Sequence, residues 1–186
     1  LDENGDVSKY DSEGWHEAVD SKITSDGWTI AVHGDYVLVG AWQDGSASYS
    51  DDGGETFTLL EEVPTIAGKV TVAFDTYYAT NNIIYAAVED YEAEGGGIYR
   101  WVIGTSDKWE DTGADHGLQY TGLVLDRPAP ANPMTSADTG GVLYASYVNG
   151  GTTGVARCLT PAEDTSYNST SWDYLIEGLT TDTTIM

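Results

Sequence analysis

The stretch Val70-Thr-Val-Ala-Phe-Asp75 begins a pattern that continues through Ile83-Ile-Tyr-Ala-Ala-Val88, Gly97-Ile-Tyr-Arg-Trp101 and Lys108-Trp-Glu-Asp-Thr112. Each segment alternates apolar and polar residues or is continuously apolar, and turn residues separate it from the next. Short segments of this kind, rich in β-branched and aromatic residues, are typical of β-strands. The stretch therefore predicts a meander of four strands.

The same pattern recurs on both sides of this stretch. The copy before it consists of Trp28-Thr-Ile-Ala-Val32, Asp35-Tyr-Val-Leu-Val-Gly40, Ser46-Ala-Ser-Tyr49 and Thr56-Phe-Thr-Leu-Leu60. The copy after it consists of Gly122-Leu-Val-Leu-Asp126, Val142-Leu-Tyr-Ala-Ser-Tyr-Val148, Gly154-Val-Ala-Arg-Cys158 and Ser171-Trp-Asp-Tyr-Leu175. Equivalent positions in the three fourth strands are aromatic, namely Phe57, Trp109 and Trp172. The repeat distance is close to or above the roughly 40–50 residues of a four-stranded propeller blade.

These repeats predict an all-β fold, a β-propeller of four-stranded antiparallel blades with about three blades and a partial one in this chain. The expected parts are the outer hairpin of a preceding blade at 1–27, a blade with the best-matched turn at 28–69, blades at 70–120 and 121–179, and the start of a next blade or a linker at 180–186. In the outer hairpin, Trp15 takes the aromatic position. Because closed propellers need roughly four to eight blades, we expect the chain to belong to a longer polypeptide or an assembly.

Composition limits the classes of partner. The 186 residues include 31 acidic and 7 basic side chains, which gives a formal net charge of −24. Such a surface repels phosphate backbones and anionic lipid, so we expect no nucleic-acid partner. No apolar run approaches the ~20 residues of a membrane span, so we expect no membrane insertion. Cys158 is the single cysteine, which excludes an internal disulfide framework.

One turn matches a defined motif. Residues Ser50-Asp-Asp-Gly-Gly-Glu-Thr-Phe57 fit S-x-D-x-G-x-T-[FW], the Asp box, and the five defined positions are filled by Ser50, Asp52, Gly54, Thr56 and Phe57. The chemistry of such a turn is structural. Short polar side chains bind backbone groups, glycine relieves steric strain, and the aromatic residue packs beneath the hairpin.

With this motif, the sequence resembles the sialidase-like superfamily of Asp-box (BNR) propellers, and especially repeats of sortilin-type receptors and xyloglucan-cleaving endoglucanases. The residues that carry the resemblance, beside the Asp box, are Val72 to Asp75, Ile84 to Ala87 and Gly96 to Trp101. The resemblance covers roughly residues 28–179 at the level of single repeats. It implies a propeller fold, an extracellular or cell-surface location, and glycans or proteins as ligands. It does not imply catalysis, because Asp boxes in these families lie away from the active sites.

We predict no catalytic residue. Sialidases need a cluster of arginines, whereas Arg100 and Arg157 fall at equivalent third-strand positions, which indicates a repeat feature. Hydrolysis of glycosides needs two carboxylates at a defined separation, and acidic residues are too numerous here for the sequence to select a pair. Asp75 and Asp126 recur after a first strand, where we interpret them as residues that begin turns.

Two modification or metal sites are candidates. A partial calcium-loop pattern begins at Asp2, with Val7 where such loops have glycine, and its ligand positions are Asp2, Asn4, Asp6, Ser8 and Glu13. An acidic turn is the simpler interpretation, and calcium is the only cofactor that the sequence suggests. His16, His33 and His116 lack the spacing of metal ligands. Asn168-Ser-Thr170 is a glycosylation sequon.

The sequence favours a non-enzymatic extracellular or cell-surface module for binding or structural assembly, of an S-layer-like or adhesive kind. Its partner would be a protein, a glycan or further copies of itself. Four aromatic residues at strand ends or loops could stack on sugars, although packing is the simpler role, namely Trp42, Tyr77, Tyr78 and Tyr120. The alternative is a fragment of a secreted glycoside hydrolase that acts on polysaccharide.

Overall fold

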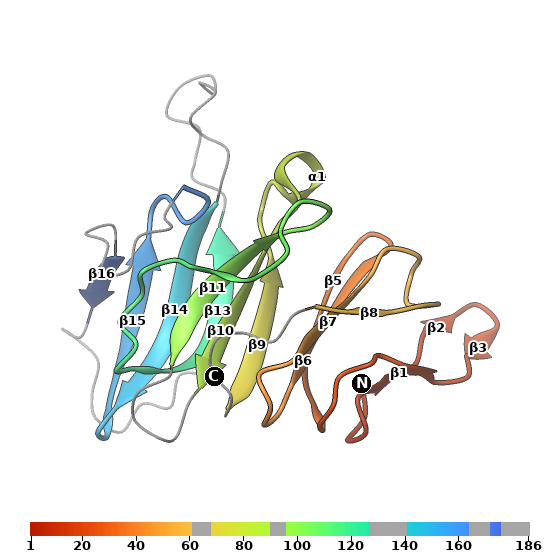
Figure 1. The fold of residues 1–186 in the computed structure, drawn as a ribbon. Coiled ribbons are helices and arrows are strands. Elements are labelled where there is room, and N and C mark those ends of the chain that lie inside the picture. Colours follow the sequence, from red (N-terminus) through yellow and green to blue (C-terminus); the bar gives the residue numbers. More distant parts are fainter. Residues whose placement is uncertain (61–67, 90–95, 127–140, 164–171, 176–186) are drawn as a thin grey trace.

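The computed structural model describes residues 1–60, 68–89, 96–126, 141–163 and 172–175, which are almost entirely antiparallel β-structure (Figure 1). The all-β prediction is therefore confirmed. Within these ranges the one helix is the four-residue α1, Tyr78–Asn81, which the sequence did not predict. The same ranges contain no helix with the length and apolar character needed to cross a membrane. The segment 180–186 lies outside the described residues.

Three four-stranded sheets follow one another along the chain, and each joins its strands in sequence order. The first sheet contains β5 (Gly27–His33), β6 (Tyr36–Ala41), β7 (Ala47–Ser50) and β8 (Thr58–Leu59). The second sheet contains β9 (Lys69–Phe74), β10 (Ile83–Glu89), β11 (Gly97–Val102) and β12 (Glu110–Asp111). The third sheet contains β13 (Gln119–Asp126), β14 (Val142–Asn149), β15 (Thr152–Cys158) and β16 (Trp172–Leu175). These are the meanders that the repeats predict.

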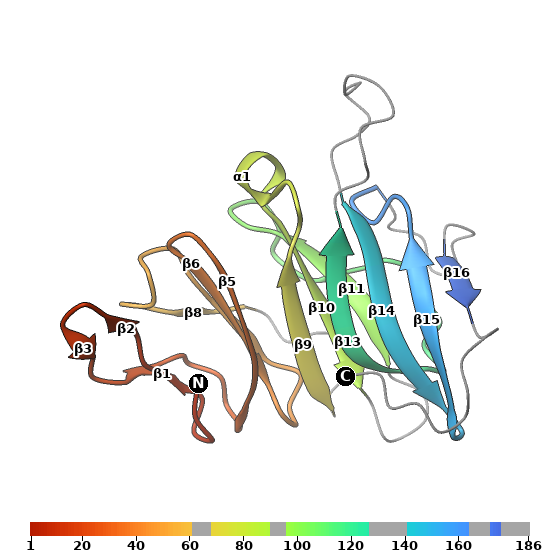
Figure 2. The same cartoon turned by 180° about the vertical axis from the view of Figure 1, so that it is seen from behind.

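A short hairpin precedes the first sheet. In it β1 (Asp6–Val7) pairs with β4 (Val19–Asp20), and β2 (Tyr10–Asp11) pairs with β3 (Gly14–Trp15). We call residues 6–20 the N-terminal hairpin. It lies beside the first sheet, on the side away from the second sheet (Figures 1 and 2).

The sheets stack face to face, and we call the face turned toward the next sheet the following face and the opposite one the preceding face. Side chains on the following face of the first sheet and the preceding face of the second form one core cluster, which includes Leu38, Tyr49, Val70, Ile84, Trp101 and Trp109. A second cluster joins the second and third sheets and includes Tyr85, Ile98, Leu143, Tyr147, Cys158 and Trp172. The second sheet is therefore buried on both faces.

Strand β10 shows why its sequence is a continuous apolar run. Side chains alternate between the two faces of a sheet, so Ile84, Ala86 and Val88 pack toward the first sheet. Ile83, Tyr85 and Ala87 pack toward the third sheet. A strand that is covered on both faces needs apolar residues at every position rather than at alternate ones.

The first and second sheets approach closely at one glycine. A Cβ atom on Gly40 would lie 2.1 Å from the carbonyl oxygen of Val70. The hydroxyl of Thr29 donates a hydrogen bond to the same carbonyl at 2.8 Å. At Gly40 a side chain of any size is therefore excluded by the neighbouring backbone.

A charged side chain also joins these two sheets. The ammonium of Lys69 in β9 lies 4.6 Å from the ring centroid of Trp28 and 4.7 Å from that of Trp42. The same ammonium forms an ion pair of 2.9 Å with Glu89, and both side chains are largely buried. Cations bind the faces of tryptophan rings, so this contact holds the first sheet against the edge of the second.

The two ends of the stack differ from its middle. On the preceding face of the first sheet, Val7, Val19 and Ile23 cover Val37, Val39 and Phe57. Ile30 and Val32 on the same face remain 43% and 63% exposed. On the following face of the third sheet, Val124 and Leu175 are 64% and 48% exposed. Apolar side chains are thus left in solvent at both ends.

Candidate functional site

The five Asp-box residues meet in one turn between β7 and β8. The Ser50 hydroxyl donates to Asp52 Oδ1 at 2.8 Å and accepts the Gly54 backbone N–H at 2.9 Å. Asp52 Oδ1 accepts the backbone N–H of Thr56 at 2.9 Å, and Oδ2 accepts the Thr56 hydroxyl at 2.5 Å. The carboxylate therefore ties both ends of the turn together.

The same contacts change the acidity of Asp52. Hydrogen bonds from the side chain and backbone of Thr56, and then from Ser50, lower the pKa of Asp52 to about 2 because they stabilise the charged form. Gly54 has φ of 88°, a left-handed conformation that glycine adopts without strain. Phe57 packs into the cluster with Val37 and Val39. In this structure the five residues build and anchor a turn.

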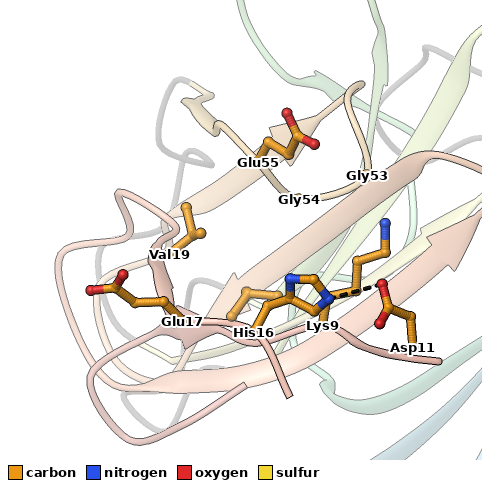
Figure 3. A pocket seen from close by; sticks show the side chains of 9 residues that line it. Lys9, Asp11, His16, Glu17, Val19, Gly53, Gly54 and Glu55 are labelled. Carbon is orange, nitrogen blue, oxygen red and sulfur yellow. Dashed lines mark ion pairs between the residues drawn. The ribbon is translucent and has the colours of Figure 1, made fainter. Parts of the chain in front are cut away.

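A groove opens beside this turn. It is a cavity of about 450 Å³ between the N-terminal hairpin and the Asp-box turn (Figure 3). Its lining comes from strands and loops of both elements and consists of Val7, Lys9, Asp11, His16, Glu17, Val19, Gly53, Gly54 and Glu55. It is the candidate binding site of the described part of the chain.

The groove presents charges of both signs. His16 Nε2 lies 2.8 Å from Asp11 Oδ2. The hydrogen bond from His16, followed by the backbone N–H of Glu13, lowers the pKa of Asp11. Lys9 points toward Gly53, while the side chains of Glu17 and Glu55 lie on other sides of the groove (Figure 3).

These groups define what the groove can bind. The Lys9 ammonium donates hydrogen bonds and the carboxylates of Glu17 and Glu55 accept them, so a ligand with both donors and acceptors is matched. Val19 adds a partly exposed apolar side chain, whereas Val7, which also lines the groove, is buried against the first sheet. Hydroxyl-rich sugars and peptide segments have this mixed character.

The predicted calcium ligands do not form a cluster. Asp2 Oδ1 accepts the backbone N–H groups of Asn4 and Asp6, each at 2.9 Å, which makes the acidic stretch a turn. The backbone N–H of Glu13 donates to Asp11 Oδ1 at 2.8 Å. Across the described ranges, no group of three or more His, Cys, Asp or Glu side chains is placed to hold a metal ion.

Asp75, one of the two aspartates that recur after a first strand, uses its carboxylate in hydrogen bonds within the fold. It is buried, and its Oδ1 accepts the backbone N–H of Tyr77 at 2.8 Å and the side-chain amide of Asn81 at 2.9 Å. The hydroxyl of Tyr85 donates to Oδ2 at 3.1 Å, and burial raises the pKa of this tyrosine. Asp75 thus begins a turn, as its sequence position indicates.

The two arginines follow the repeat. Arg100 lies opposite Tyr85 and pairs with Glu110, and Arg157 lies opposite Tyr144 and pairs with Asp173. Each arginine thus binds an acid on the fourth strand of its own sheet. The arrangement separates the two guanidinium groups into successive sheets rather than gathering them around one ligand.

Two candidate sugar-stacking residues are corrected. Tyr78 is 1% exposed and Tyr120 is 0% exposed, so neither ring can meet a sugar, because the stacked sheets cover both. Trp42 packs edge-on against Trp28, with ring centroids 4.7 Å apart. The sequon at Asn168 lies outside the described residues.

The groove could not be predicted from the sequence. His16 carries no metal-ligand spacing, and nothing in the sequence links Lys9 or Glu17 to Glu55. The stacking of the N-terminal hairpin on the first sheet brings them together, and that contact is long-range in the sequence. Comparison with known protein-family models and with curated proteins gives no match to this chain.

Proposed function

We propose that this chain is a non-enzymatic, extracellular or cell-surface module of Asp-box propeller blades that serves in binding or structural assembly, in the manner of an adhesin or surface-layer protein. The observation that carries the proposal is the contrast between the ends and the middle of the stack. The second sheet is covered on both faces, whereas the outermost faces expose Val32 and Val124 by 63% and 64%. Exposed apolar side chains at the ends of a stack whose middle is covered are consistent with a place for a partner.

Local chemistry supports a non-catalytic role. Asp52 belongs to the Asp box and Asp75 recurs in the repeats. Both use their carboxylates to bind backbone and side-chain groups near their own turns. A general acid or nucleophile needs a carboxyl group that can reach substrate. These two carboxylates are engaged in maintaining the fold.

The groove is the proposed contact site for a glycan or protein partner. It combines the Lys9 ammonium, the His16–Asp11 pair and two further carboxylates within one cavity of about 450 Å³. The lowered pKa of Asp11 keeps that carboxylate charged under mildly acidic conditions. Mixed donors and acceptors favour hydroxyl or amide groups over a bare anion.

A binding assay on the 186-residue chain tests this proposal. Labelled polysaccharides and purified surface proteins are titrated against wild type and a Lys9→Ala/Glu55→Ala variant, with Lys108→Ala/Glu163→Ala as a control that removes the same charges elsewhere. We expect saturable binding that is at least about tenfold weaker in the groove variant, equivalent to ~1.4 kcal/mol. Equal binding by both variants would exclude the groove as the site.

The same samples are assayed for new reducing sugar ends. Release of sugars from polysaccharide would contradict the module proposal and support the alternative of a secreted glycoside hydrolase. A chain that binds no member of the panel and does not self-associate would also contradict it.

A further inference from the structure

The sequence repeats predict one equivalent aromatic residue in each copy, and the structure gives one of the four a different environment. Phe57, Trp109 and Trp172 are 9%, 4% and 7% exposed, whereas Trp15 is 73% exposed. Tyr10 packs beside Trp15, with ring centroids 5.2 Å apart, and is itself 66% exposed. Two large aromatic side chains thus lie together in solvent on the N-terminal hairpin.

Trp172 and Trp109 show which surface covers the aromatic residue when it is buried. Trp172 packs against the following face of the second sheet, and its indole N–H donates to the Thr112 carbonyl at 3.0 Å. Trp109 packs with Leu38 and Tyr49 from the following face of the first sheet. In each case the aromatic residue of one repeat is covered by the sheet that precedes it.

The described residues place no sheet over Trp15 and Tyr10. Val7 and Val19 face the first sheet, and neither aromatic side chain belongs to the groove lining. The hairpin forms one end of the stack, and the third sheet forms the other (Figures 1 and 2). A sheet that covered Trp15 and Tyr10 as Trp109 and Trp172 are covered would therefore lie outside the described residues.

The following face of the third sheet is the matching open surface. Val124 and Leu175 are exposed there, and they pair with Tyr144 and Val155 in the sheet register. Arg157 lies on the same face and its side chain is 35% exposed. The equivalent Arg100, on the following face that the third sheet covers, is only 14% exposed.

We propose that these two surfaces bind each other between two copies of the chain, so that Trp15 and Tyr10 of one copy pack on the following face of the third sheet of another. The proposal rests on the assembly role proposed above and names its partner. It extends to a second copy the contact that already joins successive sheets twice within the chain.

The geometry makes this contact head-to-tail. The two surfaces are different, so each copy keeps one of each kind free after the first contact, and association continues to a closed ring or a filament. The net charge of −24 opposes the approach of two copies. Because salt screens that repulsion within about 10 Å at 0.1 M and 3 Å at 1 M, association is expected to strengthen as salt is added.

Sedimentation velocity on three single variants tests the contact. Trp15→Ser removes the aromatic surface of the N-terminal hairpin, and Val124→Asp places a charge on the following face of the third sheet. Leu59→Ser is the control, because Leu59 is 42% exposed and belongs to neither of these surfaces. We expect wild type and Leu59→Ser to associate in 1 M NaCl. We expect Trp15→Ser and Val124→Asp each to remain monomeric, with circular dichroism spectra like that of wild type.

A mixture of the two damaged variants tests whether the contact between copies is head-to-tail. Each retains the surface that the other lacks, so an equimolar mixture of Trp15→Ser and Val124→Asp forms dimers and no larger species. Persistent monomers in the mixture, association of either variant alone at the wild-type level, or a wild type that is monomeric at all salt concentrations would overturn the proposal.

Different results would contradict self-association and the proposed function. A monomeric wild type that binds a glycan or a different protein through the groove contradicts only self-association. A wild type that releases sugar from polysaccharide contradicts the proposed function, whatever its state of association.

Discussion

Asp52 and Thr56 are joined by two hydrogen bonds, from the Thr56 backbone N–H at 2.9 Å and from its hydroxyl at 2.5 Å, and both end on the same carboxylate. One side chain thus fixes the start and the end of the Asp-box turn. The link exists in full only while the carboxylate is ionised, because a protonated oxygen accepts these bonds less well. The stability of the turn is therefore coupled to pH.

Acid should remove this stabilisation in a defined window. The pKa of Asp52 falls from 3.8 to about 2 in the folded chain, so its contribution is fully present above about pH 4 and is lost as the pH falls toward 2. We expect Asp52→Asn to be less stable than wild type at pH 6, with a difference that shrinks between pH 4 and 2. Urea unfolding at a series of pH values measures the difference in the free energy of unfolding between the two proteins. A difference that stayed constant from pH 6 to pH 2 would contradict the stabilising role of the ionised Asp52 carboxylate.

Gly40 should not tolerate a side chain. A Cβ atom would meet the Val70 carbonyl at 2.1 Å, so Gly40→Ala has to separate the first and second sheets. We expect a loss of about 2 kcal/mol in the free energy of unfolding. Gly117→Ala is the control, because its nearest new contact is the Asp115 carboxylate at 3.3 Å, which can move. Similar losses at both positions would show that close approach is not the cause.

Trp172 and Trp15 should differ in their effect on stability. Trp172 is 7% exposed and donates to a buried carbonyl, so Trp172→Ala is expected to cost about 3–5 kcal/mol. Trp15 is 73% exposed, so Trp15→Ala in the monomer should cost less than about 1 kcal/mol. Thermal unfolding at low salt and low protein concentration compares them. Equal losses would mean that the N-terminal hairpin buries Trp15 in solution.

The Lys69 contact can be tested by a double-mutant cycle. Lys69→Met keeps the side-chain stem but leaves the largely buried Glu89 without its partner, and we expect a loss of about 2–3 kcal/mol. Adding Glu89→Gln should recover part of that loss, because the unpaired charge is gone. The emission of Trp28 and Trp42 should also change when the cation leaves their faces. Additive effects of the two substitutions would exclude the ion pair as their connection.

Most strands could be predicted because their signal is local. The apolar run Ile83–Val88 gives β10, Ile83–Glu89, and the run Val142–Val148 gives β14, Val142–Asn149. Side-chain period and flanking turn residues determine such segments without reference to distant parts of the chain. The Asp-box turn is local in the same way, since its hydrogen bonds join residues within four positions of each other.

The candidate site could not be predicted because its contacts are between distant segments. Glu55 lines the same groove as Lys9 and His16 only after the N-terminal hairpin has stacked on the first sheet. Burial has the same origin, since Tyr120 lies near a strand end yet is completely covered. The exposure of Trp15 is a further case, because it takes the same aromatic position in the predicted repeats as Trp109, which is buried.

The sequence order of the strands also has a consequence for folding. Each sheet joins only strands that are consecutive in the chain, so each sheet can form without first bringing distant segments of the chain together. The chain should therefore behave like a repeat array, in which neighbouring units stabilise one another. The second sheet has a neighbour on each side, so its amide protons should exchange with solvent most slowly, and the N-terminal hairpin should open first.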